Sequence, residues 1–187
     1  MQPEMISMSP GYQRRVSLSN LNIFRTMKNL TDTTRNDLVR ILQIGLEDGQ
    51  SVSDIVKNIV ARTDVSRSRA YRIVRTEINQ SYRTAAMEES IQLNNDIYRD
   101  SAFELRSLWF SALSSTTRRE HGRRHGRVYT FNQVRKFYNK GANAINCYCS
   151  QTQVLVNKET GEVLQSDLQT QMSRQREMFE EESDLFG

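Results

Sequence analysis

Residues 109–149 read WFSALSSTTRREHGRRHGRVYTFNQVRKFYNKGANAINCYC, and this stretch concentrates the unusual residue types of the chain. It holds both histidines, both cysteines and the only tryptophan of a sequence of 187 residues. Between Arg118 and Lys136, seven basic residues stand against Glu120 alone, a local balance of +6 that exceeds the +4 of the whole chain. The remainder is therefore slightly acidic, and no nucleotide-binding or hydrolase motif lies beside the basic run.

The composition limits the class of protein. A chain of this length suits one domain, or one domain with extended arms. The hydrophobic share of 37% and the mean hydropathy of −0.66 indicate a modest core with polar helices that need a partner or stay solvated. No apolar run suits a membrane span or a signal peptide, so we expect no membrane partner and a protein that stays where it is made. The pI near 9.2 allows nucleic-acid contact without establishing it.

Upstream of this stretch, residues 1–30 have no sustained period and are predicted to form an N-terminal arm. The arm offers apolar side chains to a partner, namely Leu18, Leu21 and Phe24. Thr31 or Thr33 then caps a predicted helix that ends at Gly49, and Ser51 opens a second, shorter helix. Both carry one apolar stripe, which predicts a helical hairpin.

Ser66 opens a third, longer helix that is predicted to reach about Leu93. Its apolar face consists of Ala70, Val74, Ile78, Ser81 and Ala85. Glu77 lies on that face, where a carboxylate is costly unless it is paired. We expect a buried ion pair with Arg75 or, preferably, Arg118, rather than catalysis, because no second carboxylate lies at a general-acid spacing.

After residue 100 the hydrophobic period changes to two, which predicts a strand over residues 102–112 whose far end, near Trp109, is the more buried. Gly122 and Gly126 interrupt the basic run and predict a loop rather than a helix there. Asn132 is predicted to cap a following helical turn.

The C-terminal part predicts a β-hairpin and then a weak acidic helix. Residues 151–157 and 162–165 alternate around a polar turn, and residues 167–187 carry Leu168, Met172 and Phe179 at helical spacing. We expect the acidic tail to be exposed or docked on a basic partner surface. The predicted fold class is α+β: a helical N-terminal half, a small mostly antiparallel sheet and a C-terminal helical tail. The predicted divisions are an arm at 1–30, a domain at 31–157, and the hairpin end with the tail at 158–187.

Four candidate metal ligands lie in this stretch: His121, His125, Cys147 and Cys149. Imidazole and thiolate groups in one loop system can hold zinc in a tetrahedral site. The alternative is that His121 hydrogen-bonds in the core while the thiols pack as small hydrophobic groups. A disulfide between cysteines one residue apart closes a strained ring, so we expect both to be reduced and near His121. A catalytic Cys–His pair lacks a third, orienting group.

The basic loop also suits phosphate groups. Its arginines stand among glycines with few aromatic residues, which favours backbone contacts over base stacking. The candidate DNA-binding residues are Arg119, Arg123, Arg124 and Arg127.

The order of these features resembles the phage Mu F-like minor head proteins, also called head-morphogenesis proteins, over about residues 35–157. The matching residues are Arg75, Thr76 and Glu77 in a helix, Trp109 in a strand, Arg118, His121 and Gly126 in the loop, and Asn146, Cys147 and Cys149 at its end, after an upstream Gly49, Gln50 and Ser51. The chain departs from the pattern at Ser114 and Ser115, where members often have Gly-Asp, and at Tyr148, where arginine is usual. It also lacks the proline common before Asn146 and is shorter than usual at the N-terminus.

The resemblance implies a virion protein that associates with the portal vertex, after assembly in the host cytoplasm, and assists head assembly or genome packaging and delivery. Its implied partners are the portal protein and a capsid or scaffolding protein, and no enzymatic activity is implied. Two alternatives stay open: a sequence-independent DNA-binding virion protein, and a zinc-dependent nuclease or transferase.

Overall fold

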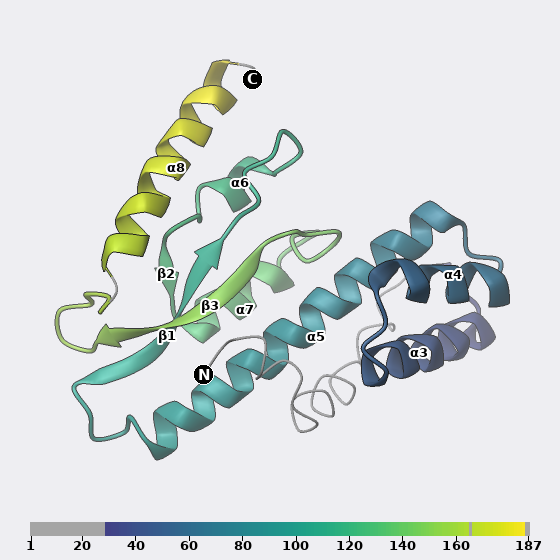
Figure 1. Cartoon of the computed structure of the whole chain (residues 1–187), viewed down its shortest axis with the longest axis horizontal. Coiled ribbons are helices and arrows are strands. Elements are labelled where there is room, and N and C mark those ends of the chain that lie inside the picture. The colour runs from purple at the N-terminus through teal and green to yellow at the C-terminus, as the bar shows by residue number, and fades with distance from the viewer. Residues whose placement is uncertain (1–28, 165, 186–187) are drawn as a thin grey trace. The chain divides into compact units, whose positions relative to one another are not determined.

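The computed structural model describes residues 29–164 and 166–185, and it contains six helices and three strands in these ranges. The described residues form two compact units: 29–85 with Ala144–Cys147, and Ala86–Asn143 with 148–164 and 166–185. Figure 1 shows the elements in chain order. Helices fill the first unit and a three-stranded antiparallel sheet with further helices fills the second, so the predicted α+β class is confirmed.

The first unit contains the predicted helical hairpin. Helix α3 (Asp32–Glu47) begins after Thr31, whose side chain accepts a hydrogen bond from the Thr34 amide, so Thr31 rather than Thr33 is the cap. Gly49 follows α3 with φ of +64°, a left-handed conformation that favours glycine. Helix α4 (Val52–Arg62) begins after Ser51. The apolar stripes of both helices are buried together, through Leu38, Ile41, Leu42, Leu46, Ile55, Val56 and Ile59.

Helix α5 (Arg67–Asp96) is the longest element, and its residues belong to both units. Every position of its predicted apolar face is buried, including Ser81. Ala70, Val74 and Ile78 join the core of α3 and α4. A fully buried valine or isoleucine side chain contributes about 1.5–3 kcal/mol to stability, so this face accounts for the docking of the helix.

The second unit is built on strand β1 (Phe103–Phe110), which lies between its two partners in the order β2-β1-β3 (Figure 1). Strand β3 (Ser150–Asn157) pairs antiparallel with all eight residues of β1, and β2 (Val128–Tyr129) pairs with two. The predicted strand and its more buried far end are confirmed. The second arm of the predicted hairpin is reduced to one bridge, between Val156 and Val163.

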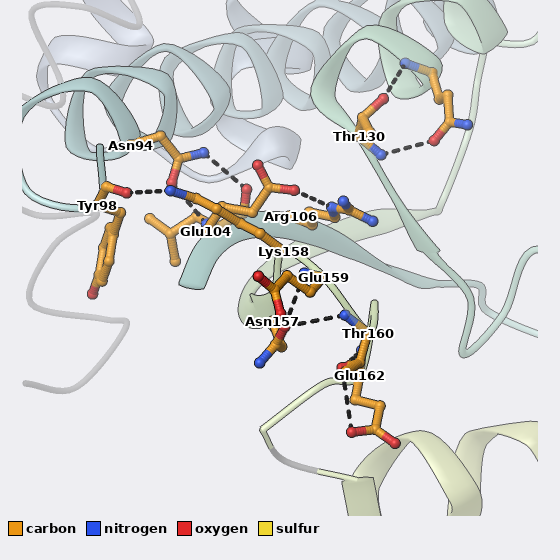
Figure 2. A network of polar contacts seen from close by, with 12 residues as sticks. Asn94, Tyr98, Glu104, Arg106, Thr130, Asn157, Lys158, Glu159, Thr160 and Glu162 are labelled. Atoms are coloured by element: carbon orange, nitrogen blue, oxygen red, sulfur yellow. Dashed lines mark hydrogen bonds and ion pairs between the residues drawn. The ribbon is translucent and has the colours of Figure 1, made fainter. Parts of the chain in front are cut away.

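Polar contacts join the ends of the elements in this unit (Figure 2). The Asn94 side chain donates to the Leu105 carbonyl at 3.0 Å and accepts from the Leu105 amide at 2.7 Å. Lys158 Nζ donates to the Tyr98 and Arg99 carbonyls at 2.7 and 2.9 Å. These bonds attach β1 to the last part of α5, and the turn after β3 to the residues that follow α5.

Two sequence predictions around the basic loop are wrong in detail. Helix α6 (Arg119–Gly122) occupies part of the predicted loop, since one helical turn is too short to show a period. Helix α7 (Phe131–Asn139) begins after Thr130 rather than Asn132. Thr130 and Gln133 form a reciprocal capping box, which Figure 2 shows.

Helix α8 (Ser166–Leu185) confirms the predicted C-terminal helix and packs against α6. Phe179 lies directly against Gly122, and Met172 against Gly126, where a larger residue has no room. Arg176 Nη1 donates to the His125 carbonyl at 2.7 Å. The acidic tail therefore docks on the basic loop of its own chain. In the ranges that the structure describes, no helix has the length and apolar character that crossing a membrane requires.

Candidate functional site

The centre of the second unit is a cluster of rings around Trp109, which is fully buried near the end of β1. Tyr138 stacks on the indole with ring centroids 5.1 Å apart, and Phe137 meets it edge-on at 5.1 Å. The Trp109 backbone accepts from the Gly126 amide and donates to the Arg127 carbonyl, so the loop is held against the strand. Trp109 thus links the strand, α7 and the basic loop.

Arg124 belongs to this ring cluster. Its guanidinium lies 3.9 Å from the ring centroid of Phe137, 4.9 Å from that of Tyr129 and 5.6 Å from that of Trp109. Cation–π contact of this kind stabilises a partly buried arginine. Among the predicted DNA-binding residues, Arg124 thus packs on rings, whereas Arg119, Arg123 and Arg127 are exposed.

His121 and Cys149 form a buried imidazole–thiol pair, with His121 Nδ1 3.4 Å from Cys149 Sγ. The imidazole meets Phe137 edge-on at 4.9 Å, which fixes the plane of its ring. On the other side of the thiol, Ser111 Oγ lies 3.2 Å from Cys149 Sγ. The sequence places both cysteines near His121, and this contact confirms the prediction for Cys149.

His125 is also buried, but its two ring nitrogens are engaged elsewhere. Nδ1 accepts from the Ser111 amide at 3.0 Å, so Nε2 carries the proton and donates to Gln175 Oε1 at 3.0 Å. A nitrogen that coordinates a metal cannot keep such a partner. His125 is thus a poor ligand, and it holds Ser111 in place beside Cys149.

Cys147 is joined to Cys149 through Tyr148 alone, so the covalent chain keeps the two thiols close. Both cysteines lie in the described part of the chain, and neither forms a disulfide. Cys147 belongs to the first unit, whereas His121 and Cys149 belong to the second. Of the three predicted metal ligands in the second unit, His121 and Cys149 lie in contact, whereas the ring nitrogens of His125 bind other partners.

The Arg-Thr-Glu residues of α5 hold the segment that leads to Cys147. Arg75 Nη1 donates to Asn146 Oδ1 at 2.8 Å, and Thr76 Oγ1 accepts from the Asn146 amide at 2.9 Å. Asn146 has φ of +50°, a left-handed conformation that asparagine tolerates better than most residues. One helical turn further, Asn79 donates to the Cys147 carbonyl at 2.7 Å. These contacts lie within the first unit.

Glu77, the third residue of that motif, is fully buried, as predicted. The predicted ion pair with Arg118 is wrong: among the described residues, neither carboxylate oxygen has a hydrogen-bond partner. Burial raises the pKa of the Glu77 carboxyl to about 8. Arg118 instead donates to the Ala142 carbonyl at 2.8 Å and lies 3.4 Å from His121 Nε2.

Sequence reasoning missed Asn79, Ser111 and Gln175, which support the predicted residues through single side-chain hydrogen bonds. Only Asn79 had a signal, because it lies three residues after Thr76 and therefore on the same helical face. The partners of Ser111 and Gln175 lie up to 50 residues away. No spacing rule reveals such contacts.

The comparisons with known proteins give one family. The model of the family described as Phage Mu protein F like protein matches residues 36–152, which is more than half of the chain and contains every residue of the proposed motif. Neither the search of curated proteins nor the search of solved structures finds a match. The chain therefore belongs to the Phage Mu protein F like family, a family of phage head proteins.

Proposed function

We propose that this chain is a minor head protein that joins the portal vertex of a phage and acts in head morphogenesis, and in genome packaging or delivery. The observation that supports the proposal is that residues of the family motif make contacts inside the folded chain. Arg75 and Thr76 bind Asn146, and Trp109 packs in a ring cluster. Motif residues that make internal contacts favour a structural component over an enzyme.

The helical first unit and the arm are the proposed portal-binding surface. Ile44 on α3 and Val60 on α4 leave 39% and 42% of their surface exposed, although both lie in helices with an apolar stripe. The apolar arm residues Leu18, Leu21 and Phe24 lie outside the described residues, so their part in the proposal rests on sequence alone. A capsid or scaffolding protein is the alternative partner for the same surface.

Co-purification with the portal protein of the same phage tests this proposal. The full chain is expected to co-purify, and the double variant Ile44→Ser, Val60→Ser to lose most of the portal. The matched control is Ile97→Ser, which changes an exposed isoleucine of the second unit. Loss of the portal with the control alone, or retention with the double variant, contradicts the proposed surface.

A second candidate function is sequence-independent contact with DNA. Arg119, Arg123 and Arg127 are exposed and come from one short segment, which suits phosphate contacts. Changing all three to glutamine is expected to weaken DNA retention at low salt and to flatten its salt dependence. The charge-matched control changes Arg40, Lys57 and Arg62, which are exposed in the first unit. Equal losses from the two triple variants would show that only net charge matters.

A further inference from the structure

We propose that the outer edge of β3, along residues 150–154, pairs with the same edge of a second copy of this chain, so that two sheets join into one. This inference goes beyond the role in head assembly and does not depend on it. The residues that carry it all belong to the second unit and to the described part of the chain. Strand β3 lies at the edge of the sheet, because the strand order is β2-β1-β3 (Figure 1).

The backbone groups of every second residue of β3 point away from β1. On β1, the amide and carbonyl of Leu105 bind the Asn94 side chain, so they point away from β3. In an antiparallel pair, two opposite residues either exchange both backbone hydrogen bonds or exchange neither. Leu155 lies opposite Leu105, so its amide and carbonyl point outward. Those of Gln153, two residues earlier on the strand, point the same way.

Only one part of this outer edge is closed by the chain itself. The Leu164 amide donates to the Leu155 carbonyl at 3.0 Å, and the Asn157 amide donates to the Glu162 carbonyl at 2.9 Å. Gln153 differs, because among the described residues its amide and carbonyl have no partner from a neighbouring segment. Apart from β1, no described helix or strand comes close along β3. The edge around Gln153 is therefore open to another strand.

The open part of the edge also lacks the features that prevent strands from associating. Proteins block exposed edges with charged side chains, with proline or with bulges. The sequence of β3, SQTQVLVN, contains no charged residue and no proline. All eight residues pair in continuous register with β1, so the strand has no bulge. A regular, neutral edge of this kind suits the addition of another strand through backbone hydrogen bonds.

The side chains along this edge favour a second copy as the partner. Thr152 and Gln153 each carry a polar group that both donates and accepts hydrogen bonds, so each can pair with its own equivalent. Two copies of an uncharged strand also meet without repulsion between like charges. A two-fold axis sets the two strands antiparallel, which is the pairing found throughout this sheet. The exposed Leu164 side chain, beside Leu155, adds apolar surface for the second copy to cover.

The paired segment is short. Residues 162–164 occupy the edge from Leu155 onward, so a second strand has room only beside residues 150–154. Few backbone hydrogen bonds then hold the two copies together, and each contributes only about 0.5–1.5 kcal/mol in water. We therefore expect a dimer that dissociates on dilution.

Sedimentation of the full-length chain over a range of concentrations tests the proposal, together with hydrogen exchange at single amides. We expect a reversible dimer in which the Gln153 amide exchanges more slowly as the concentration rises. Gln153→Pro removes this outward amide and spares the ladder to β1, because an edge strand tolerates proline where the amide faces outward. The variant is expected to raise the dissociation constant of the dimer by about tenfold.

A pair of charge variants keeps the test decisive even if the proline variant fails to fold. Thr152 is exposed, so Thr152→Lys and Thr152→Glu each bring like charges together across the edge and are expected to be monomeric. An equal mixture of the two is expected to form a mixed dimer, because opposite charges then face each other. Gln171→Lys adds the same charge at an exposed position of α8 and is expected to keep the dimer.

Several outcomes would overturn the proposal. A chain that stays monomeric at every concentration leaves the edge without the second copy as its partner. A dimer that persists in both Thr152→Lys and Gln153→Pro uses another surface. Charge variants that do not associate when mixed, or a dimer lost equally in Gln171→Lys, would show that the edge of β3 does not hold the two copies together.

Discussion

Glu77 is a residue whose burial has a measurable consequence for stability. Its folded pKa of about 8 lies above the usual 4.5, because burial penalises the charged form. Between these pH values the folded chain holds a proton that the unfolded chain has lost. The contribution of Glu77 to stability is therefore fully present below pH 4.5 and is lost as the pH rises toward 8, by up to about 1.4 kcal/mol per pH unit.

The substitution Glu77→Gln tests this. Glutamine has nearly the shape of the protonated acid but does not titrate, so we expect the variant to lose the fall in stability, a difference of roughly 4–5 kcal/mol near pH 8. Thermal melts across this pH range measure it. Glu88→Gln, at an exposed position of α5, is the control and should keep the wild-type profile. Identical profiles for Glu77→Gln and the wild type would contradict the raised pKa.

Thr76 gives a second prediction for a single side chain. Thr76→Val keeps the shape but leaves the Asn146 amide without its acceptor, so we expect destabilisation by about 1–3 kcal/mol in urea unfolding. Ser90→Ala is the control. Its hydroxyl donates to the carbonyl four residues earlier, as the Thr76 hydroxyl does, so its loss should cost less. Equal costs would mean that the bond to Asn146 contributes little.

At the scale of elements, α8 requires glycine in the basic loop. Gly126 has φ of +73°, and a Cβ there would lie 2.8 Å from Met172 Cβ and 3.1 Å from the Met172 carbonyl carbon. Gly126→Ala is therefore expected to destabilise the chain by roughly 1–3 kcal/mol and to expose the amides of α8 to hydrogen exchange. Gly161→Ala is a close control, because Gly161 has the same φ and nothing within 4 Å of its added Cβ. If both variants cost the same, backbone strain rather than α8 explains the requirement.

The elements also show how far the sequence predicts the structure. Local patterns predicted α3, α4, α5 and β1, because burial of one face leaves a period in the sequence. The Thr130–Gln133 capping box was equally local and was overlooked in favour of Asn132. The ring contacts of Arg124, and the lack of a hydrogen-bond partner for Glu77 among the described residues, could not be predicted, since both depend on tertiary packing. The histidines and cysteines lie close together in the sequence, which was enough to predict that His121 lies near a cysteine. It was not enough to show that the ring nitrogens of His125 bind other partners.

At the scale of the whole molecule, the proposal assigns different surfaces to the portal and to DNA. Deleting residues 1–28 removes Leu18, Leu21 and Phe24 but keeps Leu30, which packs against the helical core. We expect this variant to fold and to be absent from purified heads, because we propose that these apolar side chains bind the portal. Immunoblots of purified particles, with circular dichroism of the isolated variant, measure both outcomes.

The loop variant, with Arg119, Arg123 and Arg127 changed to glutamine, is expected to behave in the opposite way. These arginines are exposed, and Arg124, which supports the ring cluster, is kept, so the variant should fold and enter heads normally. Its DNA retention should fall most at low salt, because counterion release makes phosphate contacts strongest there. If the arm deletion enters heads normally while the loop variant is excluded, the basic loop binds the protein partner. The arm would then have no part in incorporation.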